Sequence, residues 1–169
     1  MISEPSLSRS TKRTGGRFHG PADNGEAAQT GMMIESDIIY ALVKSDDWLK
    51  PTATTLFQRI IQRKLGIVYV SREALHGLYY VSMEEGVSLD EYISRVASLT
   101  SIPNLEFLHT THETDILALT IMKQFGITSI FDAYHAATCL SMVPDRTIIS
   151  TDKVYDRVPG LKRVDPRNI

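Results

Sequence analysis

The chain has 169 residues, of which 43% are hydrophobic, and its formal net charge is −2 at pH 7. These values are typical of one water-soluble domain with a full hydrophobic core. The weak negative charge excludes a general electrostatic attraction to nucleic acid. No apolar run approaches the roughly 20 residues that a membrane-spanning helix needs. The single cysteine, Cys139, rules out an intrachain disulfide, so we expect a cytoplasmic protein.

The first 31 residues differ in composition from the rest. They hold five of the ten glycines, four basic and three acidic side chains, and no hydrophobic periodicity. Such a segment cannot bury enough apolar surface to offset the entropy lost on ordering. We therefore expect a disordered tail at residues 1–31 and one domain at residues 32–169. A weakly basic arm that touches RNA is the alternative for the tail, and Met32 or Met33 is an alternative start.

Short β-branched runs alternate with amphipathic helical patterns from residue 32 onward. Strands are predicted at 32–36, 67–70, 105–108 and 147–150, with a short last strand around Val164. Helices are predicted in each interval. This order predicts an α/β fold whose parallel sheet is covered by helices on both faces.

Acidic side chains follow several predicted strands. Asp37, Glu73 and Asp152 each come soon after a strand, and a parallel sheet brings the carboxyl ends of its strands to one edge. Asp132 lies among apolar residues at the start of a helix, where a charge needs a partner. Each acid also has an ordinary alternative: Asp37 is a suitable helix N-cap, and Glu73 a favourable first-turn acid.

Several carboxylates at one edge repel one another and raise their own pKa values. A divalent cation relieves this repulsion, and an all-oxygen ligand set favours Mg²⁺ or Mn²⁺ over Zn²⁺. Such a site can activate water and stabilise the charge that develops in phosphodiester cleavage. The cations best placed to steer RNA toward it are Lys44, Arg72, Lys153 and Arg157.

Three blocks of the sequence carry a family resemblance: ESDIIYALVKSDDWLK, SIFDAYHAAT and IISTDKVYDRVPG. They resemble the conserved blocks of PIN-domain proteins, in particular the archaeal branch of VapC-type toxin ribonucleases, over about residues 32–167. The resemblance implies a three-layer α/β fold with a central parallel sheet of about five short strands. It also implies dependence on Mg²⁺ or Mn²⁺, hydrolysis of RNA, a homodimer and, for the toxin branch, a small antitoxin protein as partner.

Asp37, Asp132 and Asp152 match three of the acids of this family. Asp156, one helical turn beyond Asp152, is a candidate accessory metal ligand. The candidate catalytic residues are thus Asp37, Asp132, Asp152 and Glu73, and Asp156 joins them in the expected metal site.

The second acidic position of the family falls on Gly77 in this chain. Glu73 lies one turn earlier on the same helix face, displaced by about 6 Å along the axis. If Glu73 does not replace the missing acid, the alternative function is a catalytically weakened PIN-like module that binds RNA or a protein. The nearby Tyr79 and Tyr80 are interpreted as core, with a dimer or antitoxin interface as the alternative.

Overall fold

The computed structural model describes residues 31–169. The tail predicted at residues 1–31 lies outside the described part except for Gly31, which begins the first strand. In chain order the elements are β1 (Gly31–Ile34), α1 (Ser36–Val43), α2 (Lys50–Ile61), β2 (Ile67–Ser71), α3 (Glu73–Glu84), α4 (Leu89–Thr100), β3 (Leu105–Leu108), α5 (His112–Phe125), α6 (Ile130–Met142), β4 (Thr147–Ile149), η1 (Lys153–Arg157), β5 (Lys162–Val164) and η2 (Pro166–Asn168).

The five strands form one sheet in the order β3-β2-β1-β4-β5, and all neighbouring strands are parallel. This arrangement confirms the predicted fold class. The central strand β1 pairs with β4 so that Ile34 lies beside Ile149, and the amide of Glu35 continues the pairing by donating to the Ile149 carbonyl at 3.0 Å. The residues that follow β1 and β4 therefore meet at one edge of the sheet.

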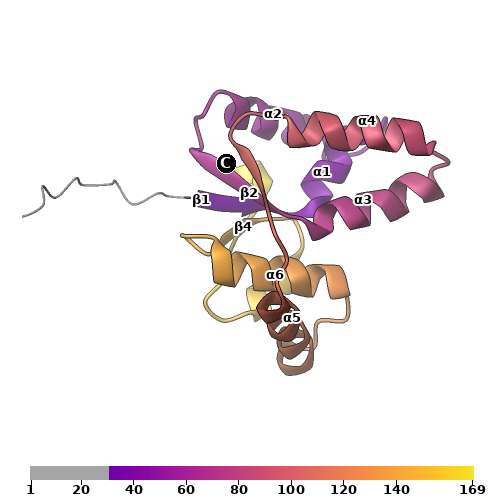
Figure 1. The fold of residues 1–169 in the computed structure, drawn as a ribbon. Helices are drawn as coiled ribbons and strands as arrows, with labels where there is room; N and C mark the ends of the chain where they lie inside the picture. The colour runs from indigo at the N-terminus through magenta and orange to yellow at the C-terminus, as the bar shows by residue number, and fades with distance from the viewer. Residues whose placement is uncertain (1–30) are drawn as a thin grey trace, which may run out of the picture.

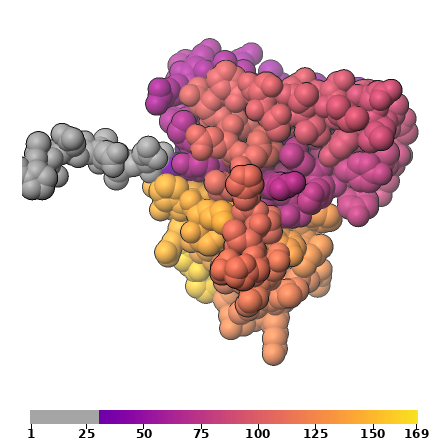
Figure 2. All heavy atoms as spheres, in the orientation of Figure 1, coloured from indigo at the N-terminus to yellow at the C-terminus, as the bar shows by residue number. Residues whose placement is uncertain are grey.

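Helices cover both faces of the sheet (Figure 1), with α1 to α4 on one side and α5 and α6 on the other. Successive residues of a strand point to opposite faces, and the two cores follow this rule. Ile34 and Ile149 pack with α1 and α2, whereas Met33 and Ile148 pack with α5 and α6. In the space-filling view α3 and α4 (magenta to pink) gather at one end of the molecule (Figure 2).

Local capping explains several helix ends. Ser129 accepts a hydrogen bond from the Asp132 amide at the start of α6, and Gly126 ends α5 in the left-handed conformation at φ 65°. The capping interpretation of Asp37 is wrong, because β1 ends at Ile34 and α1 already begins at Ser36. Asp37 lies inside the first helical turn and points its carboxylate elsewhere.

Within residues 31–169 no single helix is long and apolar enough to cross a membrane. The α5 and α6 helices reach the necessary length and composition only together, and they are bent by 114° at the break between them.

Candidate active site

A pocket of about 440 Å³ lies beyond the carboxyl ends of β1 and β4. The residues after β1, the middle of α3, the start of α6 and the residues after β4 all contribute to its wall. The lining residues are Glu35, Ser36, Asp37, Tyr40, Gly77, Tyr80, Val81, Ser129, Phe131, Asp132, Thr151 and Asp152. Four carboxylates from three parts of the chain thus share one pocket.

Glu35 is the most buried of these acids, with 6% of its surface exposed. The hydroxyl of Ser36 donates to one carboxylate oxygen, and the hydroxyl of Ser150 donates to the other at 3.3 Å. Nε2 of His135 lies 3.8 Å from the same carboxylate. Burial raises the pKa of Glu35 well above its ordinary value, and the charge of Asp37 raises it further.

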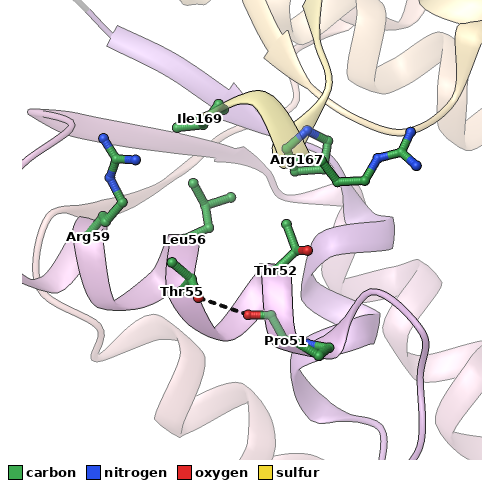
Figure 3. Close-up of a pocket in the computed structure, with 8 residues that line it drawn as sticks. Pro51, Thr52, Thr55, Leu56, Arg59, Arg167 and Ile169 are labelled. Carbon is green, nitrogen blue, oxygen red and sulfur yellow. Dashed lines mark hydrogen bonds between the residues drawn. The ribbon is translucent and has the colours of Figure 1, made fainter.

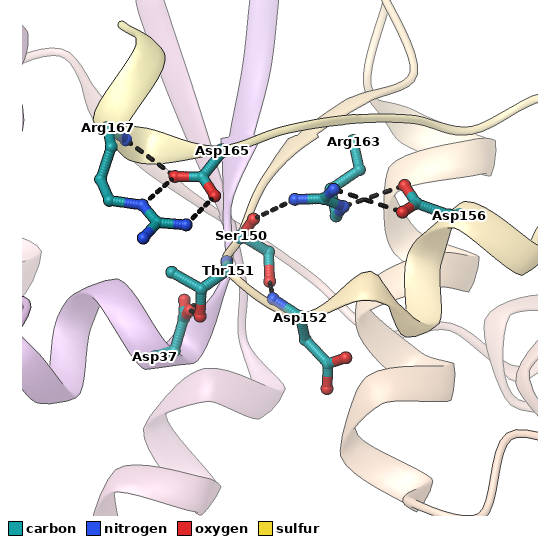
Figure 4. A network of polar contacts seen from close by, with 8 residues as sticks. All are labelled: Asp37, Ser150, Thr151, Asp152, Asp156, Arg163, Asp165 and Arg167. Atoms are coloured by element: carbon teal, nitrogen blue, oxygen red, sulfur yellow. Dashed lines mark hydrogen bonds and ion pairs between the residues drawn. The ribbon is translucent and has the colours of Figure 1, made fainter.

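Asp37 ties α1 to the segment after β4. Its Oδ2 accepts hydrogen bonds from the backbone amide of Thr151 at 3.1 Å and from the Thr151 hydroxyl at 2.7 Å (Figure 4). Its Oδ1 is buried and has no hydrogen-bond partner. A buried carboxylate oxygen without a partner costs free energy, so this atom is suited to receive a ligand.

Asp132 and Asp152 complete the acidic wall. Burial raises the pKa of Asp132, and the charges of Asp152 and Asp37 act in the same direction. Asp152 caps η1, because its Oδ1 accepts from the Val154 amide at 2.8 Å. The raised pKa values of Glu35 and Asp132 mean that these two acids ionise less readily unless positive charge enters the pocket.

The ligand atoms in the pocket suit a hard divalent cation, because all charged side chains that line the pocket are carboxylates. In addition, Oδ1 of Asp37 has no hydrogen-bond partner in the protein. In their present positions, however, no three Asp, Glu, His or Cys side chains of residues 31–169 form a group that could hold a metal ion. Binding of a cation therefore requires the carboxylates to turn toward one another.

The structure does not bring Glu73 into this pocket. Its Oε1 accepts a hydrogen bond from the Thr110 hydroxyl at 2.8 Å, and its Oε2 lies 2.8 Å from Nδ1 of His76. These partners, from the segment before α5 and from α3 itself, hold the carboxylate outside the pocket. Gly77, one turn later, lines the pocket instead.

Asp156 also lies outside the pocket-lining set. Both of its carboxylate oxygens accept hydrogen bonds from Arg163, at 2.9 and 3.2 Å. The same guanidinium donates to the carbonyl of Ser150 at 3.1 Å (Figure 4). Asp156 is therefore the counter-ion of an arginine that holds the segment leading to Asp152.

Tyr40 occupies the space that a side chain at position 77 would need. A Cβ built on Gly77 would lie 1.9 Å from the Tyr40 hydroxyl oxygen. Burial raises the pKa of Tyr40 to about 12, so its hydroxyl stays protonated at neutral pH. The pocket thus has a neutral hydrogen-bond donor among its acids.

Sequence reasoning missed Glu35 and Tyr40 as site residues. The first strand was predicted to run to Ser36, which left Glu35 inside it. The signal was available, because Glu35 directly follows the apolar run of β1. For Tyr40 no sequence signal exists, because its place depends on how α1 packs against α3.

The predicted steering cations differ in position. Lys44 pairs with Glu85 at 3.4 Å, and Arg72 lines a separate hollow beside Leu75. Lys153 and Arg157 are exposed on η1, directly after Asp152. The two η1 cations therefore remain the better candidates for an RNA contact.

A second hollow, of about 310 Å³, lies between α2 and η2 (Figure 3). Its wall contains prolines, threonines, aliphatic side chains and the arginines Arg59 and Arg167. No carboxylate side chain lines this second hollow, so the candidate active site is the first pocket, which has four of them.

The fold and the acidic pocket agree with a sequence comparison. The PIN domain family matches residues 32–161, and the chain belongs to this family. No curated protein matches the chain.

Solved structures with a similar fold include a VapC toxin and two VapBC complexes. VapC20 of Mycobacterium tuberculosis, described as a sarcin–ricin loop cleaving toxin, has 16% identity and a TM-score of 0.62 over 80% of this chain and 99% of its own. VapBC2 of Rickettsia felis, bound to a promoter DNA fragment, has 17% identity and a TM-score of 0.58 over 80% and 98%. VapBC-1 of nontypeable Haemophilus influenzae has 17% identity and a TM-score of 0.59 over 82% and 99%. At these identities the likeness shows the fold alone.

Proposed function

We propose that this protein is a metal-dependent ribonuclease that hydrolyses phosphodiester bonds of RNA, and that it is the toxin of a toxin–antitoxin pair. One observation carries the proposal: Glu35, Asp37, Asp132 and Asp152 line a single pocket of a PIN domain. The buried Oδ1 of Asp37, which has no protein partner, adds support.

These four carboxylates are the proposed ligands of Mg²⁺ or Mn²⁺. When bound, such a cation supplies activation of water and neutralisation of the charge that develops on the phosphate. Glu73 and Asp156 are not part of the proposed ligand set, because each is bonded to other partners.

The remaining pocket residues orient the acids and the substrate. The hydroxyls of Ser36 and Thr151 donate to Glu35 and Asp37 and fix their carboxylates. The Tyr40 hydroxyl is a neutral donor that suits a non-bridging phosphate oxygen, since ionised carboxylates can only accept. Lys153 and Arg157 attract the RNA backbone toward the pocket.

The toxin role and the partners rest on the similar folds. VapC20 is described as a toxin that cleaves the sarcin–ricin loop, and two of the similar structures are VapBC complexes. For this chain we accordingly propose a small antitoxin partner. The homodimeric state and the cytoplasmic location stay predictions from the sequence.

The test is a calorimetric Mn²⁺ titration followed by RNA cleavage. The proteins are the wild type, Asp132→Asn and, as a matched acid outside the pocket, Asp156→Asn. We expect Mn²⁺ binding and cleavage by the wild type and by Asp156→Asn, and loss of both in Asp132→Asn. Equal behaviour of the two variants would contradict the assignment of the pocket.

A second candidate function, a PIN-like binding module with weakened catalysis, is favoured by two observations. Glu73 is held away from the pocket by its hydrogen-bond partners. Within residues 31–169, no three acidic, histidine or cysteine side chains lie close enough together, in their present positions, to hold a metal ion. If the wild type binds RNA but neither binds Mn²⁺ nor cleaves, this second function is correct. Glu73→Ala should leave Mn²⁺ affinity unchanged under either function, because its carboxylate lies elsewhere.

A further inference from the structure

Two aromatic rings border the acidic pocket where α3 faces the start of α6. Tyr80 and Phe131 both line the pocket, and their ring centroids are 6.2 Å apart with an interplanar angle of 60°. Phe131 directly precedes the pocket acid Asp132 in the chain. The acids and the rings are therefore parts of one continuous surface.

Tyr80 is unusually exposed for a residue in an aromatic cluster, with 60% of its surface accessible. The sequence pattern suggested core for this position, and the structure corrects that interpretation. Its helical neighbour one turn earlier on the same face is Gly77, which has no side chain to separate the ring from the pocket. An exposed ring that lines an acidic pocket is suited to contact a ligand.

The charge of the pocket limits how RNA can bind there. Four acids repel a phosphate backbone, and the whole chain has a net charge of −2. A cation in the pocket and the η1 residues Lys153 and Arg157 would offset part of this repulsion. A source of free energy that does not depend on charge would add to their effect. Stacking of a base on an aromatic side chain is such a source, since it contributes about 1–3 kcal/mol per base.

We propose that Tyr80 and Phe131 form a nucleobase subsite, in which one unpaired base of the RNA stacks beside the phosphate that the acidic pocket receives. This inference rests on the proposed function, because it names the part of the substrate that the same pocket recognises. A base inside a duplex is already stacked and paired, so the subsite selects single-stranded loops and ends.

The α3 helix offers a matched control. Tyr79 is also exposed, at 41%, and packs edge to face on Tyr80 and on Tyr92. It does not line the pocket. Tyr79→Ala and Tyr80→Ala thus remove the same group from adjacent positions of one helix.

The experiment measures binding of a fluorescein-labelled single-stranded oligoribonucleotide by fluorescence anisotropy, with Ca²⁺ as the divalent cation in the buffer. An abasic oligonucleotide of equal length and a duplex serve as comparison probes. We expect Tyr80→Ala to weaken binding of the single strand by roughly 5- to 150-fold, and Tyr79→Ala to change it less than about twofold. Neither variant should change binding of the abasic strand or the duplex, and Mn²⁺ affinity should be unchanged in both.

The subsite would be overturned if Tyr80→Ala bound the single strand as tightly as the wild type, or if it lost as much affinity for the abasic strand. The two rings would then be assigned to the binding of a protein partner. The proposed function fails by a different result, namely a wild type that neither binds Mn²⁺ nor cleaves RNA. A Tyr80-dependent affinity for the single strand in such a protein would still support the subsite.

Discussion

The Thr151 hydroxyl donates a 2.7 Å hydrogen bond to the carboxylate of Asp37 across 114 residues of sequence. This contact joins the segment after β4 to α1 and orients one oxygen of Asp37, while the other oxygen remains buried without a partner. Residues that orient a metal ligand typically change metal affinity by about 10- to 100-fold when they are lost.

Thr151→Val should therefore weaken Mn²⁺ binding by about tenfold in a calorimetric titration. Thr151→Ser keeps the hydroxyl and should retain an affinity within about threefold of the wild type. If valine and serine give the same affinity, Asp37 does not depend on this hydrogen bond for its orientation.

Gly77→Ala tests the close approach of Tyr40. The added Cβ would lie 1.9 Å from the tyrosine oxygen, so the ring must move, which we expect to lower the free energy of unfolding by about 1 kcal/mol. In a Tyr40→Phe background the nearest ring atom is Cζ of residue 40 at 3.3 Å, a tight contact that a ring shift of a few tenths of an ångström would relieve. The higher helix propensity of alanine should then dominate and raise stability by up to about 1 kcal/mol.

Urea unfolding of the wild type, both single variants and the double variant measures this sign change. Equal effects of Gly77→Ala in the two backgrounds would show that Tyr40 and residue 77 are not coupled.

Glu35→Gln tests the burial of an acid with a raised pKa. The pKa of Glu35 is raised in the folded protein. The contribution of this carboxyl to stability is therefore fully present below its ordinary pKa of 4.5, and it is lost as the pH rises through the folded-state pKa. In EDTA the variant should therefore melt at a higher temperature than the wild type at pH 8, and the difference should shrink toward pH 4.5. Addition of Mn²⁺ should stabilise only the wild type, because the variant has lost a ligand.

The buried His135 sets the background for this comparison. Burial lowers the pKa of His135 to about 4 from 6.5, so both proteins lose stability as the pH falls below 6.5. Because Nε2 of His135 lies 3.8 Å from the Glu35 carboxylate, the difference between wild type and variant reports on Glu35 most directly above pH 6.5, where this histidine is neutral in both the folded and the unfolded chain. A difference in melting temperature that is constant from pH 5 to pH 8 would contradict a raised pKa for Glu35.

Arg163→Met tests the arginine that holds the segment before Asp152. The guanidinium bonds both oxygens of Asp156 and the carbonyl of Ser150. Asp156 is about half exposed, so loss of the ion pair itself should cost little. We expect a loss of about 1 kcal/mol in chemical unfolding, mainly from the Ser150 contact, and a weaker Mn²⁺ affinity. Asp156→Asn should change neither quantity by much.

The fold and most of the acidic pocket could be predicted from the sequence. Strand and helix periodicity and the acids that follow several strands are local features, and parallel pairing is the arrangement that alternating strands and helices favour. Asp37, Asp132 and Asp152 accordingly meet in one pocket, as expected. The missed Glu35 reflects a strand boundary misplaced by two residues, which is enough to hide an acid at the end of a strand.

Tertiary packing alone decided which side chains complete the pocket. Helical spacing kept Glu73 as a candidate, but Thr110, 37 residues later in the chain, bonds its carboxylate outside the pocket. The approach of α1 to α3 placed the Tyr40 hydroxyl against Gly77, and the approach of α3 to α6 placed Tyr80 beside Phe131. Sequence periodicity determines which face of a helix is apolar, whereas the contacts of one helix with another depend on packing of the whole chain.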